Sequence, residues 1–237
     1  MNFLHRLAAV LVAVVLAGCA AQPLSQEQLQ TIRSVGVVWL VPDRITFQKL
    51  GLTVFGNERS SFDMGEPLEP LVVRAVTDRL TGTRPTWSVR PLRYDAAALL
   101  QRVRSGGMAL SRDVERIAPD LAGLASADGV DALLVFVPVR WDNAPYFGGE
   151  GLGVWRRALP GLDSPILHAN FALHVVDARG NVLASDGSVD RANPIRVTAP
   201  DYAREVPTDP QIAGRLRADL RALALGNVRA RAQALGF

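Results

Sequence analysis

Two unbroken apolar runs constrain the fold of this 237-residue chain more than any other feature. The first covers residues 35–41 and ends at Pro42-Asp43, and the second covers residues 132–139. Neither run alternates between apolar and polar residues, as a strand with one exposed face would. Unbroken runs of this length are typical of strands that other elements cover on both faces. We therefore expect both to be central strands of one sheet.

Segments with helical periodicity lie between and after these runs. Asp95 and Asp209 are placed to cap helices, and Pro119 should break or kink a third helix. Gly180, in the loop 177–181, can supply the positive φ that a tight hairpin requires. The predicted helices cover residues 66–80, 95–103, 111–125 and a C-terminal segment from 209, and the shorter predicted strands cover 45–47, 52–55, 87–92, 166–176 and 182–189.

Strands that alternate with helices, followed by hairpins late in the chain, predict an α/β fold with an α+β tendency. We expect one domain, in which helices pack on a mixed β-sheet with late hairpins. The order of the elements resembles the periplasmic α/β domains of curli-secretion-type lipoproteins and the amino-terminal part of the Tol-system β-propeller protein. That resemblance implies a fold of the same kind and assigns no functional residues.

The first residues have the pattern of a bacterial export signal. His5 and Arg6 precede an apolar run over residues 7–21, which is shorter than the ~18 or more residues that a membrane-spanning helix needs. The run contains Leu16-Ala17-Gly18-Cys19, and Cys19 is the only cysteine of the chain. This sequence resembles the lipobox of bacterial lipoproteins. The resemblance implies cleavage before Cys19 by signal peptidase II and attachment of fatty acyl chains, such as palmitate, to Cys19. An ordinary secretory signal is the alternative.

The export signal suggests three parts of the chain. We expect residues 1–18 to be a signal peptide, 19–33 a lipidated cysteine and tether, and 34–237 a periplasmic α/β domain. The polar tether from Ala20 to about Gln30 would reach about 35–40 Å when extended. Inner-membrane lipoproteins often carry aspartate after the cysteine, where this chain has Ala20. That sorting pattern implies a lipid anchor in the outer membrane that faces the periplasm, with a Gram-positive cell surface as the alternative.

The charge balance argues against a nucleic-acid partner. The chain has 26 basic and 23 acidic residues, a net charge of +3, and Lys49 is its only lysine. Arginines are interspersed with acids, as at Arg112-Asp113, which is typical of solvated surfaces. With one cysteine the chain cannot form an internal disulfide, so its apolar core must hold the fold. We expect the membrane to be a partner through acylated Cys19, and the oligomeric state is open.

Histidine placement limits metal chemistry. His168 and His174 lie on one predicted strand at an even spacing, so their side chains share a face, which we expect to be exposed to solvent. The opposite face, with residues 167, 169, 171, 173 and 175, would be the buried one. Six residues along a strand cover about 20 Å, too far for both histidines to bind one metal ion. We therefore expect no metal.

Sequence motifs for nucleophilic catalysis are absent. The chain has no G-x-S-x-G, no S-x-x-K and no phosphate-binding loop. Two acidic pairs, Asp142 with Glu150 and Asp186 with Asp190, leave a carboxylate-pair hydrolase open as an alternative. We expect a protein that is not an enzyme and has no cofactor.

Residues 141–157 combine aromatic side chains with four glycines between 148 and 153. This segment has two interpretations. It forms a long hairpin whose aromatic rings pack on the sheet, or it forms a surface that contacts an envelope protein, a glycan or the membrane interface. The function expected is a binding or scaffolding module of the cell envelope, and the alternative is a small-ligand or glycan-binding lipoprotein. The candidate contact residues are Trp141, Tyr146, Phe147 and Trp155.

Overall fold

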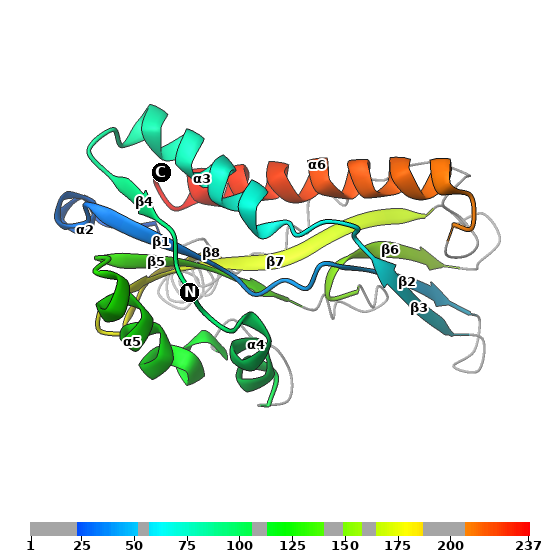
Figure 1. Ribbon diagram of the computed structural model, residues 1–237, viewed down its shortest axis with the longest axis horizontal. Helices are drawn as coiled ribbons and strands as arrows, with labels where there is room; N and C mark the ends of the chain where they lie inside the picture. The colour runs from blue at the N-terminus through cyan, green and yellow to red at the C-terminus, as the bar shows by residue number, and fades with distance from the viewer. Residues whose placement is uncertain (1–22, 52–56, 106–112, 140–148, 158–164, 187–206) are drawn as a thin grey trace, which may run out of the picture.

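One mixed sheet with helices on both faces forms the protein (Figure 1). The computed structural model describes residues 23–51, 57–105, 113–139, 149–157, 165–186 and 207–237. The strands are β1 (Ser34–Trp39), β2 (Arg44–Leu50), β3 (Glu58–Asp63), β4 (Ser88–Arg90), β5 (Ala132–Pro138), β6 (Gly151–Arg157), β7 (Ile166–Asp177) and β8 (Val182–Asp186). The helices are α2 (Gln26–Thr31), α3 (Glu69–Thr83), α4 (Ala96–Arg104), the 3₁₀ helix η3 (Asp113–Ile117), α5 (Ala118–Asp128) and α6 (Pro210–Ala234).

The long strand β7 joins two halves of this sheet. Its first residues pair antiparallel with β6, and its second half pairs antiparallel with β5 and β8. On the β5 side, β1 runs parallel to both β5 and β4. On the β6 side, β2 pairs parallel with β6 and antiparallel with β3. The prediction of a mixed sheet with a late hairpin, packed by helices in one domain, is confirmed.

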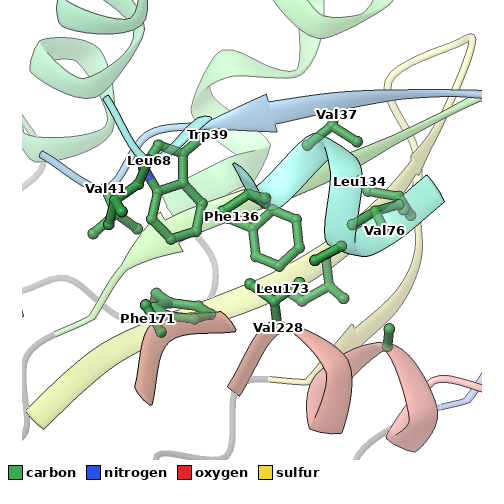
Figure 2. Close-up of a cluster of buried hydrophobic side chains, with 14 of the residues drawn as sticks. Val37, Trp39, Val41, Leu68, Val76, Leu134, Phe136, Phe171, Leu173 and Val228 are labelled. Carbon is green, nitrogen blue, oxygen red and sulfur yellow. The ribbon is translucent and has the colours of Figure 1, made fainter. Parts of the chain in front are cut away.

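The two apolar runs are the central strands β1 and β5, as predicted. They pair directly with each other, and every residue in both strands is buried. Side chains alternate between two cores, one against α3 and α6 and the other against α4 and α5. Figure 2 shows the first core, where the rings of Trp39, Phe136 and Phe171 pack with centroids 5.2–5.9 Å apart.

The predicted helix boundaries hold with small shifts. Asp95 accepts a hydrogen bond from the Ala98 amide (3.0 Å), and Asp209 accepts one from the Gln211 amide (2.7 Å). The expected break at Pro119 is also present, because η3 ends where α5 begins and the proline lies in the first turn of α5. Strand β2 pairs antiparallel with β3, and the predicted strand over residues 52–55 lies outside the described residues.

Residues 24–32, which we assigned to the tether, belong to the folded domain. Ser25 and Gln28 form a reciprocal capping box at the start of α2. Leu24, Leu29 and Ile32 are buried in the core, and the Leu24 amide donates to the Leu235 carbonyl (3.2 Å). The polar residues that suggested a tether form the exposed side of α2.

Burial of β5 on both faces gives a test of the core. Leu134→Asp places an unpaired carboxylate in this core and should lower the free energy of unfolding by several kcal/mol. Val182→Asp is the matched control, because Val182 is 37% exposed and should change stability by less than about 0.5 kcal/mol. Urea unfolding of residues 23–237 measures both. Equal midpoints for the two variants would contradict the placement of β5.

Candidate functional site

A pocket of about 360 Å³ lies where β2, β3 and β6 meet the C-terminal end of α4. In Figure 1 these strands are at the end of the sheet remote from α2. Most of the lining side chains are polar, and three are arginines. The lining residues are Pro42, Arg44, Thr46, Arg59, Ser60, Ser61, Arg104, Glu150, Gly151 and Leu152.

Strand alternation in β2 places polar side chains toward this pocket. Ile45 and Phe47 point into the core against α3 and α6, so Arg44 and Thr46 point to the opposite face. In the antiparallel register, Thr46 lies directly across from Ser61 of β3. A short polar face on the β2–β3 hairpin therefore forms one wall of the pocket.

An ion pair forms the opposite wall. Glu150 Oε1 accepts from Arg104 Nε (3.0 Å) and Nη2 (2.5 Å), so these two charges neutralise each other. Arg44 instead donates from Nη2 to the Ser61 hydroxyl (2.8 Å). Among the described lining residues, no carboxylate pairs with Arg44 or Arg59. The pocket therefore carries a net positive charge.

Two side chains of β7 hold the backbone that carries Glu150. His168 Nδ1 donates to the Gly151 carbonyl (3.0 Å), and Asn170 Nδ2 donates to the Gly149 carbonyl (2.7 Å). Glu150 lies between these two anchored carbonyls. The position of its carboxylate therefore depends on His168 and Asn170 of β7. The ion pair with Arg104 depends on the same two side chains.

The imidazole of His168 is neutral and tightly enclosed. A carbonyl can only accept, so the proton is on Nδ1, and Nε2 has no hydrogen-bond partner among the described residues. Burial lowers the pKa of His168 to about 4. A Cβ on Gly149 or Gly153 would lie 2.6 or 2.7 Å from Nε2. These two glycines therefore leave room for the imidazole, and Gly153 also leaves room for the Thr46 carbonyl of β2.

The expectation that His168 and His174 are exposed to solvent is wrong. They are 7% and 1% exposed, so the face of β7 that carries them is buried as well. His174 Nδ1 is 2.9 Å from the Ser185 hydroxyl, and burial lowers its pKa to about 4 as well. The opposite face of β7 is buried as predicted, at Leu167, Ala169, Phe171, Leu173 and Val175.

The predicted aromatic contact surface is wrong in one of its residues. Trp155 is 4% exposed on β6, so it packs in the interior of the protein. Trp141, Tyr146 and Phe147 lie outside the described residues, as does Cys19. A contact role for these three aromatic residues and lipidation of Cys19 remain predictions.

The two described acidic residues that were considered for hydrolysis are each paired with an arginine. Glu150 is bound to Arg104, and buried Asp186 accepts from Arg231 of α6 (3.1 Å). Asp142 and Asp190 lie outside the described residues. In the described part of the chain, no three His, Cys, Asp or Glu side chains gather as metal ligands would, and no helix is both long and apolar enough to cross a bilayer.

Sequence reasoning missed Arg44 and Arg59 as site residues. The signal was the alternation over residues 44–48, in which Arg44, Thr46 and Gln48 are polar and the residues between them are apolar. That pattern predicts a strand with one polar face. It does not show that Arg59 of β3 and Arg104 of α4 meet at that face.

Comparison with known proteins gives little further information. No protein-family model matches the chain, and no curated protein is similar enough in sequence to count as a relative. Among solved structures, the chain is similar to the lipoprotein GNA1162 from Neisseria meningitidis, with a TM-score of 0.29 and 18% sequence identity. The aligned region covers 65% of this chain and 78% of that one. A similarity this weak carries no argument about this chain.

The two buried histidines predict a specific pH dependence. Between pH 6.5 and pH 4, each histidine binds a proton in the unfolded chain but not in the folded one. The free energy of unfolding should therefore fall as the pH falls through this window, by about 3 kcal/mol per histidine.

The double variant His168→Asn/His174→Asn removes both titrating groups and keeps a hydrogen-bonding group near each Nδ1 position. Urea unfolding at several pH values should give a much flatter dependence in this variant than in the wild type. An equally steep fall in stability in both proteins would contradict the burial of these imidazoles.

Proposed function

We propose that this chain is a lipoprotein of the bacterial envelope, anchored through acylated Cys19, and that its folded domain is a binding module rather than an enzyme. The anchor is inferred from the sequence Leu16-Ala17-Gly18-Cys19. The binding role is inferred from the positively charged pocket between β2, β3, β6 and α4.

The observation that carries the proposal is the burial of Leu24 at one end of the described domain. Leu24 is the fifth residue after Cys19, so a fully extended chain spans at most about 18 Å between them. Leu24 is buried and bonded to Leu235, so the anchored end of the domain is the end with α2 and the C-terminus. An acylated Cys19 would hold that end close to the lipid surface.

The pocket lies at the other end of the domain. Along α6, Arg217 donates to the Asp63 carbonyl of β3 (3.2 Å), while Leu235 at the helix end bonds to Leu24. Leu235 is eighteen residues after Arg217, which corresponds to about 27 Å of helix. Figure 1 shows the same separation, with α2 and β3 at opposite ends of the molecule. In the proposed arrangement the pocket is available to a ligand away from the anchoring membrane.

The chemistry of the pocket favours binding over catalysis. Glu150 is the carboxylate among the described lining residues, and its bond to Arg104 leaves it poorly placed as a general acid or base.

The proposed location is the outer membrane, facing the periplasm, because Ala20 follows the cysteine.

Cys19→Ser tests the anchor. Each buried CH₂ of an acyl chain contributes about 0.8 kcal/mol, and two or more chains give stable attachment. The variant should lose metabolic labelling by palmitate and processing by signal peptidase II. Ala21→Ser, two residues further on, is the matched control and should keep both.

Fractionation of outer and inner membranes then locates the labelled protein. Recovery in the outer-membrane fraction is expected. A wild-type protein that takes up no palmitate, or a Cys19→Ser protein that is labelled equally, would refute the lipid anchor.

A further inference from the structure

We propose that the pocket binds a small polyanion, held by Arg44 and Arg59 through its phosphate or carboxylate oxygens. This inference rests on the binding-module part of the proposed function and is independent of the lipid anchor. It names the chemical class of the ligand that the pocket takes.

The described residues that line the pocket carry more positive than negative charge. Arg104 and Glu150 neutralise each other across one wall. Asp63 faces Arg44 in the strand register, where its Oδ1 accepts from the Gly65 amide (2.6 Å), but Asp63 does not line the pocket. Two guanidinium groups, which match the geometry of phosphate and carboxylate oxygens, are therefore left at the pocket without an anionic partner in the described part of the chain.

The hairpin places these two arginines on either side of a pair of hydroxyl groups. Arg44 is two residues before Thr46 on β2, and Arg59 is two residues before Ser61 on the antiparallel strand β3. The two arginine backbones are thus about 13 Å apart along the strands, with the Thr46–Ser61 pair midway between them. An anion with more than one charged group, bound over this pair, can meet both guanidinium groups.

The hydroxyl groups add donors at the centre of that span. The Ser61 oxygen accepts from Arg44, so its own proton remains available to a ligand oxygen. Thr46 is 9% exposed and lines the same pocket, so its hydroxyl lies largely out of bulk water. Hydrogen bonds to a charged acceptor are stronger in such a place than in open solvent.

Other ligand classes fit this pocket less well. A metal cation would be repelled by the net positive charge. The described lining residues include no aromatic ring on which a neutral sugar or a base could stack. A volume of about 360 Å³ is at the lower end of the range for small-molecule sites, which suits a compact ligand.

The test measures binding to the full lipidated protein in phosphatidylcholine nanodiscs by calorimetry at low ionic strength. The probes are pyrophosphate, inorganic phosphate and citrate, and a further titration uses vesicles that contain phosphatidylglycerol. The wild type should bind at least one of these anions saturably, and added salt should weaken the binding. Phosphate and citrate separate the two oxygen chemistries, and the vesicles separate a headgroup from a free anion.

Variants with opposite expected effects identify the residues responsible. Arg44→Gln/Arg59→Gln should weaken binding at least about tenfold, because two charge-assisted contacts are lost. Glu150→Gln should strengthen binding several-fold, because it removes a negative charge and releases Arg104. Arg90→Gln, at an exposed position on β4 in the other half of the sheet, is the control and should bind as the wild type does.

Failure of this proposal is distinguishable from failure of the anchor. Cys19→Ser protein retains the pocket, so it should bind the same anion with unchanged affinity whether or not the wild type is lipidated. Vesicle binding that the double variant loses would support the pocket with a lipid headgroup as its ligand. Absence of saturable binding to all the probes, or equal binding by the wild type and the double variant, would overturn the proposal.

Discussion

Burial of β7 on both faces is the constraint on which the rest of the structure depends. This strand, Ile166–Asp177, is the one that pairs with β6 in one half of the sheet and with β5 and β8 in the other. Its face toward α6 is apolar throughout, and the rings of Phe171 and Trp39 meet there. Since β7 links the two halves, the β2–β3 hairpin that carries the pocket is held to the same core as the end that carries α2.

The other face of β7 carries the polar side chains of His168, which is buried, and Asn170, which is partly buried. Burial of His168 costs stability, and the hydrogen bonds of both side chains hold the start of β6 in place. Burying an imidazole whose Nε2 has no described partner costs about 1–3 kcal/mol. In return, His168 and Asn170 fix the Gly149–Gly151 backbone through two hydrogen bonds. Glycine at positions 149 and 153 is needed to admit the imidazole. The same contacts that hold the first residues of β6 also place Glu150 against Arg104 at the pocket.

The central strands, the caps at Asp95 and Asp209 and the break at Pro119 could be predicted from sequence, because each depends on local pattern. The burial of His168 and His174 could not be predicted in this way. Alternation shows that His168 and His174 share a face of β7, but whether that face is covered depends on elements distant in the chain. Residues 24–32 were assigned to the tether for a related reason. Most of them are polar, and the burial of Leu24, Leu29 and Ile32 depends on residues distant in the chain, such as Leu235. The pocket likewise could not be predicted, because its lining residues come from β2, β3 and α4, and no local sequence pattern shows that these elements meet.

Native-state hydrogen exchange of β7 tests the central claim most directly. If one strand buried on both faces unites the sheet, amides in residues 166–170, paired with β6, should exchange only through global unfolding. Their opening free energy should equal that of amides in residues 171–177, paired with β5 and β8. A clearly lower opening free energy for residues 166–170 would contradict the account, because the half-sheet that carries the pocket would then unfold separately from the core.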